Sequence, residues 1–265
     1  MRAFLRKIPI LSDIFRHLRD QKKLMSKPIH TKSGFLFNGN SDQLNENYEP
    51  EVATFLRENI KRFDSFINIG ANIGYWPVLL RHVGFSGKIF AYEPDAHNLR
   101  LMLANIQANS LTGIETGQVA LGNYNGQIDL YGFGTGISSI KGWAGGNSKR
   151  KQSVRISLLD DLISVSPGLK LLLIDVEGAE FDVLRGAEQT LNSNCELLVE
   201  ITASEHQPGK VVSNPNFLET FEYMKELGYK VSSWFPHLRE LSATDLENIH
   251  SGQASPQIQM YYFSK

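Results

Sequence analysis

Acidic side chains follow one strongly apolar stretch, and their position is the first sign of chemistry in this sequence. The segment LKLLLI (169–174) is followed at once by Asp175, Glu177 and Glu180. Acids at the carboxyl end of a buried strand lie where open α/β sheets bind ligands. They could take a proton from an attacking hydroxyl, face a cationic group or begin the next helix. Glu180 suits the helix start, whereas Asp175 comes too early for that role alone.

A glycine corner follows another apolar segment and reads Asn68-Ile69-Gly70-Ala71-Asn72-Ile73-Gly74. Gly70 permits a tight turn and close approach of the backbone to a ligand, and Gly74 lets the next helix pack near the strand. The spacing is G-x-x-x-G, whereas the loop that wraps a dinucleotide pyrophosphate is G-x-G-x-x-G. The corner therefore favours a ligand without phosphates, although a purely structural turn stays open.

Glu93 ends the next apolar segment, 19 residues after Gly74. A carboxylate at this place can accept hydrogen bonds from the diol of a ribose. The alternative is a helix start, in which Pro94 fixes the turn and Asp95 is the N-cap. Both roles are compatible. Asn98 in the following helix and Ala120 at the next corner complete the candidate ligand-binding residues.

These corners need a scaffold in which strands and helices alternate. Periodicity and turn residues predict strands at 65–70, 88–93, 114–121, 127–133, 153–159, 169–175, 195–201, 229–235 and 257–264. The same patterns predict helices at 50–62, 75–83, 95–110, 179–191 and 216–228. We therefore expect an α/β fold with a mostly parallel seven-stranded sheet and helices on both faces. The last two strands, with no good helix between them, should form an antiparallel edge pair.

The bulk composition is that of an ordinary soluble globular protein, with 42% hydrophobic and 21% charged residues in 265. The net charge of -1 gives no argument for nucleic acid as a partner. A single cysteine, Cys195, excludes a disulfide framework within the chain and favours the cytoplasm. No apolar run reaches the roughly 18 residues of a spanning helix, and the first residues do not resemble a signal peptide.

The chain divides by charge into a basic extension and connector (1–47) and a main domain (48–265). Residues 1–27 hold eight Lys and Arg against two Asp, a net charge of +6, and the rest carries −7. Apolar residues at helical spacing from Leu11 to Leu18 predict an amphipathic helix. It could make a peripheral contact with an acidic membrane, or its apolar stripe could pack on the domain.

Several motifs together resemble one known family. FINIGANIGYW, FAYEPDAHNLRLMLANIQAN, ISLLDDL, LLLIDVEGAEFDVLRGAEQTL and LLVEI stand in the order and spacing of the FkbM-type methyltransferases. The resemblance covers roughly residues 48–205. It implies a Rossmann-like class I methyltransferase fold, S-adenosylmethionine as the cofactor, and O-methylation of a hydroxyl on a sugar, glycan or related natural product.

The resemblance also assigns residues. Asn68, Gly70, Ala71, Asn72 and Gly74 become the loop on the methionine side of the cofactor, Glu93 the ribose ligand, and Asp175 with Glu177 the acidic pair under methyl transfer. Two positions depart from the family. Asn68 stands where Asp is usual, which removes a charge that favours the methionine ammonium. Leu173 stands where Lys is frequent.

A hydroxyl is a poor nucleophile, so a base should assist. The candidates are Asp175 and Glu177, then Glu200, which ends the next strand, and His206 just beyond it. A lone histidine is more often structural, and no histidine shows ligand spacing, so we expect no obligatory metal. The Gly-rich segment 132–152 ends in three basic residues and is either a substrate lid or a solvated loop.

Two other functions stay open at the level of sequence. An oxidoreductase that uses nicotinamide or a nucleotide sugar could be built on the same sheet, but it would need the dinucleotide loop and a Tyr-x-x-x-Lys pair. A non-catalytic module could retain the cofactor site without turnover, and Asn68 and Leu173 are the hints toward it. The acidic run at 175–180 favours the methyltransferase, with a small-molecule or glycan acceptor.

Overall fold

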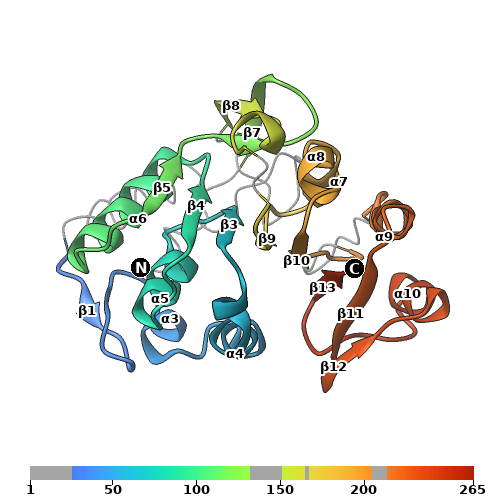
Figure 1. Ribbon diagram of the computed structural model, residues 1–265, viewed down its shortest axis with the longest axis horizontal. Coiled ribbons are helices and arrows are strands. Elements are labelled where there is room, and N and C mark those ends of the chain that lie inside the picture. The colour runs from blue at the N-terminus through green and yellow to red at the C-terminus, as the bar shows by residue number, and fades with distance from the viewer. Residues whose placement is uncertain (1–25, 132–150, 165–166, 205–213) are drawn as a thin grey trace, which may run out of the picture.

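Parallel strands bring the polar corners to one edge of a central sheet. The computed structural model describes residues 26–131, 151–164, 167–204 and 214–265 (Figure 1). Five parallel strands form the middle and one side of the sheet: β3 (Ser65–Ile69), β4 (Lys88–Tyr92), β5 (Ile114–Gly117), β9 (Lys170–Ile174) and β10 (Cys195–Glu200). Every residue of β3 and β9 is buried, as a strand covered on both faces requires.

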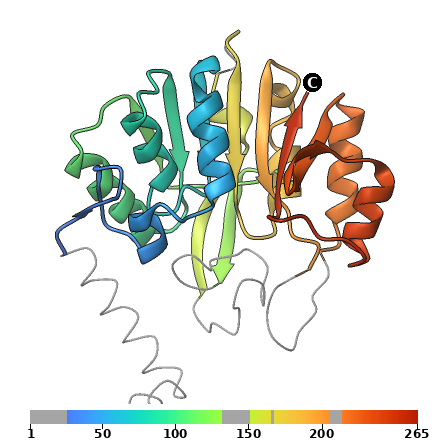
Figure 2. The same ribbon diagram turned by 90° about the horizontal axis from the view of Figure 1, so that it is seen from below.

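The other side of the sheet is antiparallel. It contains β11 (Lys230–Phe235), β12 (His237–Glu240) and β13 (Met260–Ser264). Within the described residues the order is β12-β11-β13-β10-β9-β3-β4-β5. Strand β13 lies between β10 and β11 and runs against both, opposite in direction to β4 (Figure 2). The expected α/β class, with its mostly parallel sheet and antiparallel β11–β13 pair, is confirmed.

Two elements near the end of the chain differ from the sequence-based expectation. Strand β12 adds an eighth strand and occupies the edge, so the β11–β13 pair lies inside it. Helix α10 (Ala243–His250) lies between β12 and β13, where no good helix was expected. Both elements have weak patterns: all four residues of β12 are exposed, and α10 buries only Leu246 and Ile249.

Helices cover both faces of the sheet, as expected. One face carries α4 (Pro50–Asn59) with its 3-10 extension η1 (Ile60–Arg62), α5 (Tyr75–His82) and α6 (Ala96–Ala108). The other face carries α7 (Glu180–Arg185), α8 (Glu188–Leu191), α9 (Phe217–Glu226) and α10. Alternate residues of a strand enter opposite cores: Leu171 and Leu173 pack with α4 and α5, and Leu172 and Ile174 with α7 and α9.

A second, three-stranded sheet lies beside the carboxyl ends of the central strands (Figure 1). Its strands are β6 (Ala120–Leu121), β7 (Gly126–Tyr131) and β8 (Lys151–Ser157), in the order β6-β8-β7. The sequence predicted one strand at 114–121, but the chain leaves the central sheet after Gly117, and Ala120 pairs with Ile156 of β8. Strands β7 and β8 therefore do not extend the central sheet.

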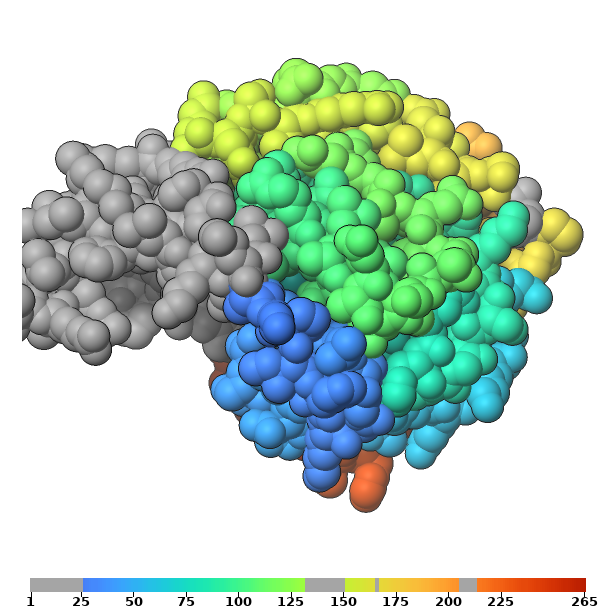
Figure 3. Space-filling model, turned by 90° about the vertical axis from the view of Figure 1, so that its left-hand side faces the viewer, coloured from blue at the N-terminus to red at the C-terminus, as the bar shows by residue number. Residues whose placement is uncertain are grey.

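The connector packs on the α4–α6 face. It contains β1 (Ile29–His30), β2 (Leu36–Phe37) and α3 (Ser41–Asn45), and it lies against α6 in Figure 3. The ring of Phe37 meets that of Tyr75 at 5.5 Å, and the Asn109 side chain bonds both backbone groups of Leu36. The predicted amphipathic segment lies almost wholly outside the described residues. None of the helices in the described ranges is long and apolar enough to cross a membrane.

Candidate active site

The glycine corner is held by backbone contacts to both neighbouring strands. The N–H groups of Gly70 and Ala71 both donate to the carbonyl of Tyr92, at 3.0 and 2.9 Å. Gly70 has φ 79°, and a Cβ there would lie 1.8 Å from the backbone oxygen of Asp175. The close approach of the chain after β9 therefore requires a glycine here, in agreement with the structural alternative that the sequence left open.

Gly74 closes the corner for a related reason. It has φ 82°, and a Cβ would lie 2.6 Å from Cγ of Met102 in α6. The sequence predicted close packing of the helix that follows Gly74, but the close neighbour is α6. Between the glycines, Asn72 has a left-handed backbone with φ 49° and lines the cavity described below.

Glu93 is buried and bonded on both carboxyl oxygens. Its Oε2 accepts the backbone N–H of Asn72 at 2.8 Å, and its Oε1 accepts the N–H of Asp95 at 2.9 Å and Nδ2 of Asn98 at 3.4 Å. Burial raises the pKa of this carboxyl to about 7, although the three donors oppose that shift. A carboxylate has about four acceptor positions, so Glu93 has room for one further hydrogen bond.

The N-cap role expected for Asp95 is also present. Its Oδ1 accepts the backbone N–H groups of His97 and Asn98 at 3.0 and 2.9 Å, and its Oδ2 accepts Nε2 of Gln152 at 2.9 Å. The corner after β4 is thereby tied both to α6 and to strand β8 of the small sheet.

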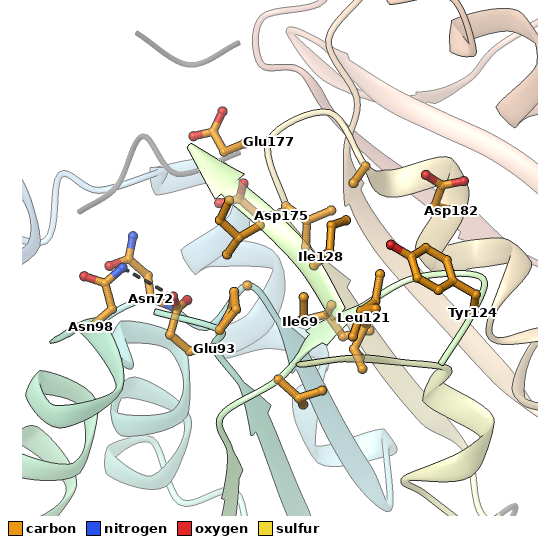
Figure 4. A pocket seen from close by; sticks show the side chains of 18 residues that line it. Ile69, Asn72, Glu93, Asn98, Leu121, Tyr124, Ile128, Asp175, Glu177 and Asp182 are labelled. Carbon is orange, nitrogen blue, oxygen red and sulfur yellow. Dashed lines mark hydrogen bonds between the residues drawn. The ribbon is translucent and has the colours of Figure 1, made fainter. Parts of the chain in front are cut away.

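A pocket opens at the carboxyl ends of β3, β4 and β9 and is walled on its far side by the small sheet (Figure 4). Asn72, Glu93 and Asn98 gather at one end, and Tyr124 and Asp182 lie at the other. The lining residues are Ile69, Gly70, Asn72, Glu93, Pro94, Asn98, Val119, Ala120, Leu121, Tyr124, Ile128, Leu130, Ile156, Asp175, Val176, Glu177, Ala179 and Asp182.

Most of the sequence-predicted residues reach this pocket. Its lining includes the candidates Gly70, Asn72, Glu93, Pro94, Asn98, Ala120, Asp175 and Glu177. Asn68, Ala71 and Gly74 lie beneath it and do not line it. His206 and nearly all of the predicted lid lie outside the described residues.

The apolar wall of the pocket was missed by sequence reasoning. Leu121 of β6, Ile128 and Leu130 of β7 and Ile156 of β8 supply it. The signal was the alternation of apolar residues in the two strands that bracket the Gly-rich segment. The sequence did not indicate a second sheet, so the common face of these strands was not placed at the site.

The turn after β9 carries strained backbone. Glu177 has φ 57° and Gly178 has φ 100°, and the Gly178 N–H donates to the Glu180 carboxyl at 2.8 Å. Glu180 lies in the first turn of α7 as expected, and burial raises its pKa to about 7. Left-handed backbone is uncommon at a residue with a side chain.

Asp175 adjoins a group of acids on the α4 face of the sheet. Glu200, at the end of β10, hydrogen-bonds to Asp175. Glu49 precedes α4 and lies close enough to Asp175 for the charge of Asp175 to raise the pKa of Glu49. The Tyr48 hydroxyl hydrogen-bonds to Glu49. Sequence reasoning included Glu200 but missed Tyr48 and Glu49, because an acid before Pro50 has the pattern of an ordinary helix start.

The electrostatics of these acids follow from burial and mutual repulsion. Burial raises the pKa of Asp175, and repulsion from Asp175 followed by burial raises the pKa of Glu200 well above its ordinary value. Burial, then the charge of Asp175, raises the pKa of Glu49 to about 7. Burial and mutual repulsion both favour the protonated forms of these acids, and an approaching cation would favour the ionised forms.

The charge of the pocket indicates its ligand. Four of the described lining residues are acids, and none is Lys or Arg. Such a lining does not match a pyrophosphate, which needs positive charge or a wrapped glycine loop. It fits a nucleoside with a cationic substituent, because the apolar wall can take a base, Glu93 can accept from a ribose and Asp175 can face a positive charge.

Comparison with known proteins gives a family and distant relatives. The family described as the methyltransferase FkbM domain matches residues 68–231, more than half of the chain. Methyltransferase 1 of Beauveria bassiana (strain ARSEF 2860) is 28% identical over an alignment of 149 residues, and the match covers 47% of this chain. The match spans 59% of that relative, less than two thirds of its length.

Solved structures with a similar fold include a methylase and a methyltransferase. The ribosomal protein L11 methylase of Lactobacillus delbrueckii subsp. bulgaricus has a TM-score of 0.45 and 10% identity, with 86% of this chain and 80% of that chain covered. A SAM-dependent O-methyltransferase of Thermotoga maritima has a TM-score of 0.42 and 13% identity, with coverages of 81% and 64%.

Proposed function

The chain belongs to the FkbM methyltransferase family, and we propose that it transfers the methyl group of S-adenosylmethionine to a hydroxyl oxygen of a small molecule, such as a sugar of a glycan. The family match confirms the resemblance found in the sequence, and with it S-adenosylmethionine as the cofactor. It favours a methyltransferase over the oxidoreductase that the sequence left open.

The charge of the pocket supports the proposal most strongly. S-adenosylmethionine is a nucleoside with a cationic sulfonium and without phosphates, and the described lining offers acids and apolar groups but no Lys or Arg. Gly70 and Asn72 then border the methionine side, and Glu93 faces the ribose. Ala120 and the apolar wall face the adenine. The assignment follows the rule that ligands bind at the carboxyl ends of parallel strands.

The proposed reaction needs no covalent intermediate with the protein. S-adenosylmethionine supplies an already activated methyl group, so the chain must align the acceptor hydroxyl with it and exclude water. Asp175 is our first candidate for the base, because it lies where the pocket meets the acids on the α4 face. Glu200 donates a hydrogen bond to Asp175, and this bond holds the Asp175 carboxylate in place.

The remaining base candidates stay proposals of lower rank. Glu177 lines the pocket from the strained turn, and His206 follows from the sequence alone. A raised carboxyl pKa makes a better base near neutral pH than an ordinary carboxylate does. Burial supplies that shift at Asp175. We also propose that the protein acts in the cytoplasm and that its acceptor is a small molecule or a glycan and not a nucleic acid.

The test is a methyl-transfer assay with isotope-labelled S-adenosylmethionine and a panel of hydroxyl-bearing sugars, glycans and small natural products, with amines and RNA as comparison acceptors. We expect label on an oxygen of at least one hydroxyl acceptor, located by mass spectrometry of the product. Label only on amines or RNA would contradict O-methylation. Cofactor binding without any transfer would favour the non-catalytic module.

A further inference from the structure

Three carboxyl groups meet on the α4 face without a cation among them. We call Glu49, Asp175 and Glu200 the acidic recess. Asp175 follows β9, and Glu200 is the last residue of the adjacent parallel strand β10. Glu49 precedes α4, the helix that covers these strands. In the part of the chain that the structure describes, no Lys or Arg forms a salt bridge with any of the three.

The position of Glu49 is not explained by the helix that follows it. It is the N-cap residue of α4, yet its side chain makes no capping hydrogen bond. Its backbone is left-handed, with φ 42°, which is uncommon for a residue with a side chain. The Tyr48 ring packs on those of Tyr75 and Trp76 at the start of α5. Asp175 acts electrostatically on the Glu49 carboxyl, so Glu49 lies near the end of β9.

Unpaired polar groups beside the recess are a second, independent sign of a ligand. Asn68 is fully buried, and neither its Oδ1 nor its Nδ2 has a partner. It pairs in register with Leu173, so its side chain lies on the α4 face, one pleat before Asp175. The Tyr75 hydroxyl is also buried and unpaired, and its ring meets that of Tyr48 at 5.3 Å.

Asp175 belongs both to the acidic recess and to the lining of the proposed cofactor pocket. The described residues contain no group of acids, histidines and cysteines with the geometry of a metal site. An ammonium group is cationic and donates three hydrogen bonds, so it matches carboxyl groups. The cofactor carries such a cation at the end of its methionine chain, remote from the adenine.

We propose that Glu49, which lies beside Asp175 and Glu200, binds the ammonium group of the methionine moiety of the cofactor. The inference rests on the proposed function. Asn68 carries no charge for this role, and Glu49 supplies one from a different segment. The loss of charge at position 68, which suggested weaker cofactor binding from sequence, is thereby offset. A carboxylate from the start of α4 also makes cofactor binding depend on that helix.

The test separates the ammonium from the rest of the ligand. S-adenosylhomocysteine keeps the ammonium but lacks the sulfonium charge, and 5′-methylthioadenosine keeps the adenosine but lacks the whole amino-acid end. We expect Glu49→Gln to raise the Kd for S-adenosylhomocysteine at least tenfold and to change the Kd for 5′-methylthioadenosine less than twofold. Glu58→Gln, an exposed acid on the same helix, is the matched control and should bind both ligands as the wild type does.

A second readout covers a variant that folds poorly. Around Glu49 stand Tyr48 and Glu51 of its own segment, Asp175 just after β9, Glu200 of β10 and Tyr75 of α5. Because a bound cation favours the ionised carboxyls, wild-type binding of S-adenosylhomocysteine should release protons at pH 6.5. Calorimetry in two buffers of different ionisation enthalpy measures that release.

The outcomes are distinct. Equal affinity of wild type and Glu49→Gln for S-adenosylhomocysteine would overturn the inference, as would equal weakening of both ligands or binding without proton release. Failure of the wild type to bind either ligand would instead contradict the proposed function.

Discussion

Glu93 and Asp175 follow strands β4 and β9, which flank β3 on its two sides, and both carboxyls line the same pocket. Their partners differ in kind. Glu93 accepts three hydrogen bonds from backbone and amide donors, whereas the neighbours of Asp175 are other acids. The first corner is held by its own hydrogen bonds and keeps one acceptor position for a ligand, whereas the second brings several acids together. We infer that the β4 corner positions the cofactor and that the β9 corner meets its charge and carries the chemistry.

The largest effect should come from Asp175. Asp175→Asn removes the proposed base while keeping the size of the side chain, so methyl transfer should fall by about 10²–10⁴-fold. The Kd for S-adenosylhomocysteine should change much less than the rate, because Glu49 is the proposed partner of the ammonium. Initial rates at saturating cofactor, with calorimetry for binding, measure the two quantities.

The control for Asp175 is Asp42→Asn, an exposed acid of α3, which should keep the wild-type rate. Glu177→Gln should lose less activity than Asp175→Asn. A reversal of that order would assign the base role to Glu177, two residues further along the same corner.

Gly70 joins the two corners, and its substitution should be the most destabilising of those considered. Gly70→Ala places a Cβ 1.8 Å from the Asp175 backbone oxygen, so β3 and β9 must separate. We expect a loss of about 3 kcal/mol or more in the free energy of unfolding. Denaturant titration followed by circular dichroism measures it.

Gly84→Ala is the matched control for that substitution. Gly84 has a similar φ of 85°, but no atom lies within 4 Å of the added Cβ, so only the backbone strain is shared. A loss of about 1 kcal/mol is expected there. Equal losses at both positions would show that the close approach of β9 contributes nothing.

A smaller effect is expected at the corner after β4. Glu93→Ala should weaken binding of S-adenosylmethionine by about 1–3 kcal/mol, the cost of leaving bonded polar groups unpaired. Part of that loss comes from the released N–H of Asn72 rather than from the ribose. Calorimetric titration checks the value, with Glu115→Ala, an exposed acid on β5, as the control. Unchanged affinity would place the ribose elsewhere.

The smallest effect concerns pH. The pKa of Glu49 is about 7 in the folded protein, raised first by burial, and near the ordinary value of 4.5 when unfolded. The folded state therefore binds more protons between these values, so the free energy of unfolding falls as pH rises from about 4.5 to 7. In Glu49→Gln that fall should shrink by about 1 kcal/mol, since Glu49 is only partly buried and solvent screens part of the effect. Thermal midpoints from pH 5 to 8 measure it, and parallel curves for both proteins would contradict the assignment.

Much of the scaffold followed from local pattern. Apolar runs such as 169–174 and 65–69 predicted their strands because a strand covered on both faces must be apolar throughout. Helix α6 was predicted from its N-cap, Asp95, and its spaced leucines. Strand β12 and helix α10 were missed because each buries little, so no apolar period marks them.

The site was predictable where one segment supplies several of its residues, as in the corners at 70–74, 93–98 and 175–177. It was not predictable where the fold joins separate segments. Glu49 reaches Asp175 across more than a hundred residues, and the wall residue Ile156 reaches the corner after β4 through a second sheet. No local period encodes either contact.

The central claim is that this pocket binds S-adenosylmethionine and not a dinucleotide. Calorimetric titration of the purified protein with S-adenosylmethionine, and separately with NAD, tests it most directly. The acidic lining without Lys or Arg in the described residues predicts saturable binding of S-adenosylmethionine and none of NAD. Binding of NAD alone would contradict the account, because a pyrophosphate would then have been accepted by a pocket built of acids.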